Sequence, residues 1–408
     1  MIKYKAQLMN TMPFFTPSRK FLPLRLLAVA LILLATASVF AQSGVEVQRT
    51  PEKGIHPRLI QDSTGDVHLL YFRKRSSNPR AREGDLYYRQ YDAASFDWGP
   101  ARRVSSQSFN HADPIYRANF AIDGDGRVHV VWYQGRPSQY FYTRSDPQRS
   151  EFEPKRSMVT DNLIGVDAGA DIAASGNQVA ISWAAGDLTM EDERTVYTRL
   201  SSDHGDTFSP EIAVGDKALG ACACCSLAVE FDHQDKLLIA YRSAIDSVGR
   251  HMQLLTVDPK INKSTSGDGK SDTSYAALAE LQKWDLSACP VTTNDIISDY
   301  QKNNWLIFET ESRIVQMNIT TGEVPSRVAE PRIRTRQKNP SIAFSSDGYK
   351  LIAWAEGVSF TRGGTLNWQL FDNLGNPVGT TDNPKIEIPD NSSPAAVVTP
   401  SGSFLILY

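Results

Sequence analysis

Three of the chain's four cysteines lie within four consecutive positions, inside the stretch GACACCSLAVEF at residues 220–231. They are Cys222, Cys224 and Cys225, and the fourth, Cys289, follows much later in the chain. Thiols this close together could bind a soft metal ion, carry out redox chemistry or form disulfides. Because disulfides persist only in oxidising compartments, the location of the protein bears on which chemistry applies.

The first 41 residues have the composition of a secretory signal peptide. They contain no acidic residue, carry Arg19, Lys20 and Arg25, and end in the apolar run LLAVALILLATASVFA at residues 26–41. An uncleaved anchor is the alternative, but 16 apolar residues fall short of the roughly 20 that span a bilayer. We therefore predict cleavage after Ala41 and a secreted or periplasmic protein with no stable membrane anchor.

The charge of the chain excludes one class of partner. The formal net charge is −3, and residues 1–41 contain five basic residues and no acidic one, so cleavage would leave a still more acidic protein. Acidic proteins bind nucleic acid poorly, and we predict no nucleic-acid partner. Residues 42–408 are too long for one ordinary core, which favours either two domains or a closed repeat architecture.

Repeated β-hairpin patterns run through residues 42–408. Seven times, an apolar stretch meets a turn and continues into a β-rich run that usually ends in an aromatic residue. These copies lie at residues 58–72, 118–133, 170–183, 227–241, 296–308, 341–354 and 395–408.

A second pattern lies between the hairpins and ends at Pro100, Pro154 and Pro210, which are 54 and 56 residues apart. Two hairpins per period predict four-stranded units, and so many units favour an all-β propeller over a β-sandwich. We expect a single propeller domain over residues 42–408 with seven blades, six being the alternative because the fifth copy lacks a Gly turn. We also expect residues 45–50 to close the last blade and residues 259–274 to form a mobile surface loop.

The segment SSDHGDTF at residues 201–208 resembles the Asp-box, or BNR repeat, of bacterial sialidases and related propellers. It matches Ser-x-Asp-x-Gly-x-Thr-aromatic at each defined position. In that family the box is a structural turn joining the outer two strands of a blade. The resemblance implies that Asp203 accepts backbone N–H bonds, that Gly205 takes a conformation other residues resist, and that Phe208 tucks beneath the blade. The remaining motif residues are Ser201 and Thr207.

The cysteine stretch extends the resemblance to a subgroup of secreted, exo-alpha-sialidase-like proteins, over roughly 90 residues. Members carry a Cys-x-Cys-Cys run, an aromatic-Arg strand end, an Arg-Asp pair and a Trp-x-x-x-x-Cys-Pro segment. In this chain the corresponding residues are Cys222, Cys224 and Cys225, then Tyr241-Arg242, then Trp284 with Cys289-Pro290. The chain departs from the subgroup at Arg250-His251, which replaces the Arg-Asp pair.

Disulfide formation is our leading prediction for the four cysteines. Cys289 directly precedes an inner strand, as Cys225 does in its own blade, so the two loops should be neighbours around the axis. We predict a bridge from Cys222, Cys224 or Cys225 to Cys289 and leave the pairing member open. A copper or zinc thiolate site aided by His251 is the alternative, although we expect neither a metal nor a cofactor.

Propeller geometry predicts where other chemistry would lie, because inner strands begin and second strands end on one axial face. As the resemblance implies, sialidases use this face: three arginines bind the substrate carboxylate, a Tyr with a Glu partner is the nucleophile, and an Asp is acid and base. Our candidates are Arg58, Arg117 and Arg242 for the clamp, Arg250 as a further ligand-binding residue, Tyr116 or Tyr300 as nucleophile, Glu309 as its partner and Asp113 as acid.

Two functions stay open from the sequence. One is a carbohydrate-active propeller, an exo-sialidase-type glycosidase or a lyase, that binds a glycan or another anionic ligand on the axial face. The other is a non-catalytic secreted propeller that binds a glycan or a protein there. Sialidases carry Arg-Ile-Pro in the first blade, whereas Leu59 follows Arg58 here, which favours the second function. A deep cup with three arginines around one carboxylate would favour the enzyme. The oligomeric state stays open.

Overall fold

The computed structural model describes residues 44–408 except 79, 114–115, 168, 260–275, 331–334, 360 and 380–382. The predicted signal peptide and nearly all of the predicted loop at residues 259–274 lie outside the described residues. The compact unit Val45–Tyr408 holds all the described secondary structure. Within the described part of the chain, no helix is long and apolar enough to cross a membrane.

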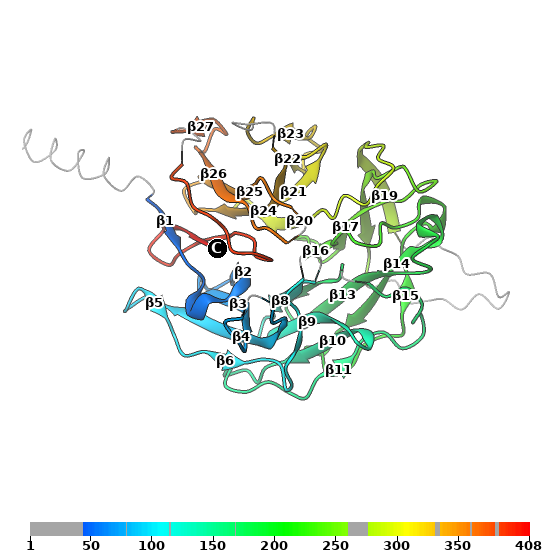
Figure 1. The fold of residues 1–408 in the computed structure, drawn as a ribbon, viewed down its shortest axis with the longest axis horizontal. Helices are drawn as coiled ribbons and strands as arrows, with labels where there is room; N and C mark the ends of the chain where they lie inside the picture. Colours follow the sequence, from blue (N-terminus) through cyan, green and yellow to red (C-terminus); the bar gives the residue numbers. More distant parts are fainter. Residues whose placement is uncertain are drawn as a thin grey trace, which may run out of the picture. The chain divides into compact units, whose positions relative to one another are not determined.

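Seven β-sheets follow one another along this unit and surround a common axis (Figure 1). From the inside outward, the strands of the first six blades are β2 (Ile55–Gln61), β3 (Val67–Lys74), β4 (Glu83–Asp92) and β5 (Asp97–Trp98); β8 (Ala118–Ile122), β9 (Val128–Gly135), β10 (Ser138–Arg144) and β11 (Arg156–Ser157); β12 (Asp171–Ser175), β13 (Gln178–Ala185), β14 (Thr195–Ser201) and β15 (Ile212–Ala213); β16 (Ala228–Phe231), β17 (Leu237–Arg242), β18 (Met252–Val257) and β19 (Ala276–Gln282); β20 (Asn294–Ser298), β21 (Asn304–Thr310), β22 (Arg313–Asn318) and β23 (Ser326–Arg327); β24 (Gln337–Phe344), β25 (Lys350–Glu356), β26 (Thr365–Phe371) and β27 (Pro377–Val378). Two short strands, β6 (Arg102–Arg103) and β7 (Phe109–Asn110), also pair with β4.

The seventh blade closes the ring with strands from both ends of the fold. It consists of β28 (Ala395–Val398), β29 (Phe404–Leu407) and β1 (Val45–Gln48), which pairs in parallel with β29. Each inner strand contacts the inner strand of the next blade, and β28 contacts β2. The seven-bladed prediction and the closure by residues 45–50 are therefore confirmed, and the six-bladed alternative is wrong.

Apolar side chains hold the blades together. Successive residues of a strand point to opposite faces of the sheet, so a blade covered on both sides needs apolar residues in both directions. Seven buried clusters satisfy this need, each lying between two neighbouring blades. Trp354 of β25, for example, packs in the cluster that contains Ile307 of β21. Fully burying one such side chain stabilises the fold by about 1.5–3 kcal/mol.

The Asp-box segment forms the loop between β14 and β15, the outer strands of the third blade. The Asp203 carboxylate accepts hydrogen bonds from the Thr207 backbone N–H at 2.9 Å and the Thr207 hydroxyl at 2.6 Å. Gly205 has a φ of 73°, where a Cβ would collide with the Tyr142 hydroxyl. Phe208 packs edge-on against the Tyr142 ring, with centroids 5.0 Å apart. These contacts hold the turn and pack it against Tyr142 of β10, in the second blade.

Candidate functional site

A narrow pocket lies on the axis where the inner strands begin. Six of the seven blades line it through His56, Pro57, Arg58, Arg117, Ala118, Asn119, Ser226, Leu227, Thr293, Asn294, Asn339, Pro340, Ser393 and Pro394. Its volume is about 30 Å³, which is about that of a single water molecule. Pockets that bind small ligands enclose roughly 300–1,000 Å³, so this pocket as formed is too small for a sugar ring.

Two of the predicted clamp arginines meet at this pocket. Arg58 lies with a side-chain nitrogen 3.6 Å from the Asp295 carboxylate, and Arg117 donates to the Asn339 side-chain oxygen at 3.3 Å. Burial and the nearby Arg58 lower the pKa of Arg117 to about 10. The mouth of the axis is therefore cationic.

Carboxylates lie on the inner strands around the same axis. Burial raises the pKa of Asp171, in β12, to about 7 and that of Glu230, in β16, to about 8. Burial also raises the pKa of Asp295, in β20, although Arg58 opposes it. Asp171 accepts a hydrogen bond from the Val229 backbone N–H at 2.8 Å. Asp171 thereby links β12 to β16, and burial keeps Asp171 and Glu230 protonated at a pH where carboxylates in water are ionised.

The other two predicted arginines are buried and bonded within the protein. Arg242 is 2% exposed, and it donates to the Thr292 hydroxyl at 3.0 Å and to the backbone carbonyls of Arg250 and Glu309. Arg250 is 3% exposed and forms an ion pair with Glu191 at 2.6 Å. Neither guanidinium points into the axial pocket, so the described residues do not assemble a three-arginine clamp there.

The predicted catalytic residues lie apart from one another. Glu309 is 2% exposed and pairs with Lys338 at 3.2 Å, and burial raises its pKa to about 7 while Lys338 opposes this rise. Tyr300 lies in the β20–β21 turn, at the other end of the strands, and donates to Gln61 at 2.9 Å. Asp113 lies 3.3 Å from Arg82. Of the two candidate tyrosines, only Tyr116 lies beside the axial face.

Tyr116 precedes β8 and packs edge-on against Tyr133, with ring centroids 5.0 Å apart. Burial and the neighbouring Asp113 raise its pKa. Its phenol is therefore neutral near pH 7, whereas a tyrosine nucleophile needs a partner that activates it. Glu309, the predicted partner, forms its ion pair with Lys338 instead.

The cysteines lie between the fourth and fifth blades. Cys224 and Cys289 form a disulfide with Cα atoms 6.8 Å apart, while Cys222 and Cys225 are free and buried. Burial tends to raise the pKa of Cys225, but the Cys222 thiol and Arg242 lower it. His251, considered above as a metal ligand, instead accepts from the Trp284 backbone N–H at 3.1 Å.

A larger cleft lies on the first blade, where β3 ends and β4 begins. Its volume is about 400 Å³, and it is lined by Arg73, Lys74, Arg75, Asp85, Tyr87 and Arg103. Four of these six residues are basic and one is acidic. This site was not predicted from the sequence, although three consecutive basic residues at 73–75, at the end of an apolar strand, were a usable signal.

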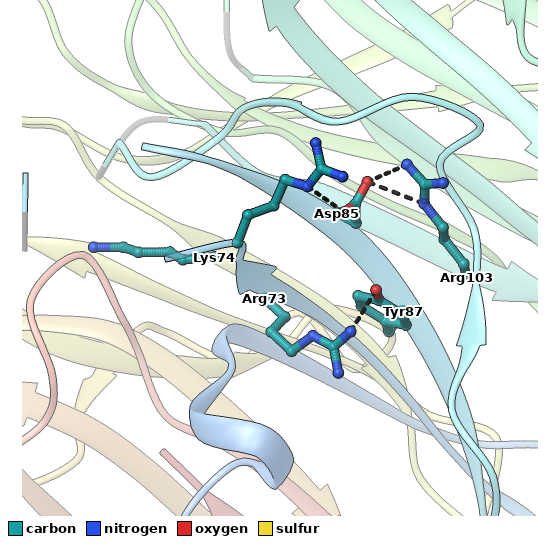
Figure 2. Close-up of a pocket in the computed structure, with 6 residues that line it drawn as sticks. Arg73, Lys74, Asp85, Tyr87 and Arg103 are labelled. Carbon is teal, nitrogen blue, oxygen red and sulfur yellow. Dashed lines mark hydrogen bonds and ion pairs between the residues drawn. The ribbon is translucent and has the colours of Figure 1, made fainter. Parts of the chain in front are cut away.

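Hydrogen bonds and ion pairs join the side chains of the cleft other than Lys74, which points away from them (Figure 2). Arg103 donates to the Asp85 carboxylate through two nitrogens, at 2.5 and 3.0 Å, and Arg75 lies 3.9 Å from the same carboxylate. Arg73 stacks on the Tyr87 ring at 4.1 Å and donates to its hydroxyl at 2.5 Å. Arg75 and Arg103 remain 65% and 44% exposed. Arg73 also pairs with Glu52, which lies outside the lining, so the excess positive charge of the cleft is carried by Lys74, Arg75 and Arg103, with Asp85 opposing it.

The fold and these surfaces define the chain as a seven-bladed β-propeller. No family model and no curated protein matches the sequence. It is similar to a protein of unknown function from Dyadobacter fermentans, with a TM-score of 0.51 and 12% identity over 78% of this chain and 94% of that one.

It is also similar to an alpha-L-arabinanase from Penicillium chrysogenum complexed with arabinobiose, with a TM-score of 0.50 and 11% identity over 81% and 98% of the chains. A Hadza microbial sialidase matches with a TM-score of 0.47 and 13% identity over 78% and 65%. At these identities the first two similarities show the propeller fold and nothing finer.

Proposed function

We propose that this chain is a non-catalytic, secreted or periplasmic propeller that binds an acidic glycan through the cationic cleft of its first blade. One observation carries the proposal: a cleft of about 400 Å³ whose lining has four basic residues and one carboxylate, and which stays cationic after Glu52 pairs with Arg73, on a chain whose net charge is −3. Its volume falls within the range of small-ligand sites, whereas the axial pocket's volume does not.

The chemistry of the lining residues favours an anionic ligand. A guanidinium binds a carboxylate or a sulfate through two parallel hydrogen bonds. Asp85 neutralises only part of the charge of Arg75 and Arg103, and both side chains keep solvent-exposed nitrogens. A uronic acid or a sulfated sugar offers carboxylate or sulfate oxygens that can accept hydrogen bonds from these guanidinium groups.

Support for a carbohydrate comes from a solved structure of similar fold and from the predicted leader. The arabinanase with a similar fold is described in complex with arabinobiose. The leader predicted over residues 1–41 would deliver the protein to a compartment where extracellular glycans occur.

The separation of the catalytic candidates favours binding without turnover. A retaining sialidase mechanism needs a nucleophile, its activating partner and an acid around one glycosidic bond. Here Glu309 is paired with Lys338, and Tyr300 is bonded to Gln61. We therefore place the ligand on the first blade instead of the axis.

The test is calorimetric titration of the purified protein with a glucuronate oligosaccharide, a sulfated disaccharide, sialic acid and neutral arabinobiose. We expect the acidic sugars to bind. Arg75→Ala should lower their affinity by about tenfold, because one hydrogen bond to a charged group is lost. The control, Arg327→Ala, removes an arginine that is 53% exposed on the fifth blade and should change nothing. Binding that is equal in both variants, or hydrolysis of a fluorogenic sialoside, would refute the proposal.

A further inference from the structure

The sulfur of Cys222 lies close to the sulfurs of the other three cysteines. The Cys222 sulfur lies 2.7 Å from that of Cys225 and 3.9 Å from that of Cys224. The sulfurs of Cys222, Cys224 and Cys289 all lie within 4.8 Å of one another. Cys222 and Cys225 have the Cys-x-x-Cys spacing that lets one loop supply two ligands to a metal.

Two neighbouring blades supply these sulfurs. Cys222, Cys224 and Cys225 lie in the loop before β16, and Cys289 lies in the segment before β20. Glu191 anchors the first loop, because its carboxylate accepts from the Ala223 backbone N–H at 2.9 Å and pairs with Arg250 at 2.6 Å. Cys222 and Cys225 are buried, Cys224 is partly buried and Cys289 is exposed, so the cluster opens to solvent at one side.

The charges around the cluster favour an anionic occupant. Arg250 pairs with Glu191, and Lys338 pairs with Glu309. Arg242, in contrast, donates its hydrogen bonds to a hydroxyl and to backbone carbonyls. Its buried guanidinium lies beside Cys222 and Cys225, and the one carboxylate recorded near it among the described residues, Glu309, already pairs with Lys338. Thiolates bound to a metal would supply the negative charge that a buried cation needs.

We propose that the reduced cluster of Cys222, Cys224, Cys225 and Cys289 binds one soft thiophilic ion, either Cu(I) or Zn²⁺. Soft thiolate ligands select these ions over harder ones. Zinc–sulfur bonds of about 2.3 Å place tetrahedral ligand sulfurs roughly 3.8 Å apart, which is close to the Cys222–Cys224 separation of 3.9 Å. Cys222 and Cys225 would move apart to admit the ion between them.

The disulfide sets the order of events. A thiol reductant transfers two electrons and two protons to the Cys224–Cys289 bond, which becomes two thiols while the reductant leaves as its own disulfide. The incoming ion then displaces protons from the thiols that bind it. Zn²⁺ would use all four sulfurs. Cu(I), which accepts fewer ligands, would depend mainly on the two buried thiols Cys222 and Cys225.

The test uses the purified protein, reduced and handled without oxygen, and titrated with Zn²⁺ or Cu(I) against a chromophoric chelator. We expect one equivalent to bind, and alkylation of the cysteines to be blocked in the metal-bound form. For zinc, Cys222→Ser and Cys289→Ser should each weaken binding by more than about tenfold. For copper, Cys222→Ser should weaken binding and Cys289→Ser should not.

His233→Ala is the control, because it removes an exposed histidine from the β16–β17 turn. It should leave the stoichiometry at one equivalent, and thermal melts establish that each serine variant is folded. The proposal is overturned if neither ion binds at one equivalent, or if the cysteine variants bind as the wild type does. It is also overturned if Cys222 and Cys225 are joined by a disulfide that persists under the reducing conditions and excludes the metal.

Discussion

The buried ammonium of Lys338 offers a quantitative test of how this fold tolerates charge. It lies 3.2 Å from the Glu309 carboxylate and donates to the backbone carbonyls of Pro290 at 2.7 Å and Val291 at 3.0 Å. Lys338→Met keeps most of the side-chain volume but removes the charge and all three hydrogen bonds. Glu309 is then a buried carboxylate without its cation.

The stability that Lys338→Met is expected to lose depends on pH because Glu309 titrates. Burial raises its pKa from 4.5 to about 7 in the folded protein. Between these values the folded state keeps a proton that the unfolded state has released, so the wild-type free energy of unfolding falls as pH rises, by about 3 kcal/mol in all.

Without Lys338 the carboxylate pKa rises further. At pH 8 the free energy of unfolding of Lys338→Met should be lower than that of the wild type by about 3–5 kcal/mol, the usual cost of removing one partner of a buried ion pair. At pH 5, where folded Glu309 is protonated, only the carbonyl hydrogen bonds are lost and the cost falls to about 1–2 kcal/mol.

Urea denaturation at pH 5 and pH 8 measures this difference. Lys350→Met is the matched control, since that buried ammonium lies 4.1 Å above the Trp305 ring and no ion pair recorded among the described residues includes it. The double variant Lys338→Met/Glu309→Gln should recover most of the loss at pH 8. Equal losses at both pH values, or no recovery in the double variant, would refute the reasoning.

Three further perturbations have defined outcomes. Gly205→Ala should lower stability by about 2–3 kcal/mol in a thermal melt, because a Cβ there meets the Tyr142 hydroxyl, whereas Gly176→Ala, also at positive φ but in open space, should cost about 1 kcal/mol. Asp171→Asn should raise the free energy of unfolding at pH 8 above that of the wild type and make it depend less on pH. Burial raises the pKa of Asp171 from 3.8 to about 7 in the folded protein, so the wild type loses stability as pH rises between these values. Val47→Asp, which puts a charge where β1 packs on the core of the sixth and seventh blades, should lower the urea midpoint by an amount equivalent to about 1–3 kcal/mol.

The sequence was sufficient to predict the architecture because local patterns repeat. Each hairpin copy contains its own strands and turn, so periodicity and turn chemistry predicted seven blades without any long-range information. Even the weak fifth copy, at residues 296–308, lies in β20 and β21. The closure of the last blade could also be predicted. The seventh hairpin copy ends the sequence without outer strands, and residues 45–50 were available to supply one.

The site was harder to predict because exposure depends on contacts between distant segments. Arg73 and Arg242 each follow an aromatic residue near the end of the second strand of their blade, yet Arg73 lines the first-blade cleft and Arg242 is buried by Thr292 and the backbone around it. Likewise, Arg103 joins Asp85 in the cleft only because β6 returns to pair with β4. No local pattern contains that information.

Because β1 pairs with β29, the strand of the fold that is synthesised first is among the last to find its partner. β1 is the first strand of the fold to leave the ribosome, but its partner begins at Phe404, so it must wait until nearly the whole domain has been made. Until then the first and sixth blades each expose an apolar face that the seventh blade will cover. Such faces promote aggregation, so the unfinished domain is exposed to this risk until its last strand is complete.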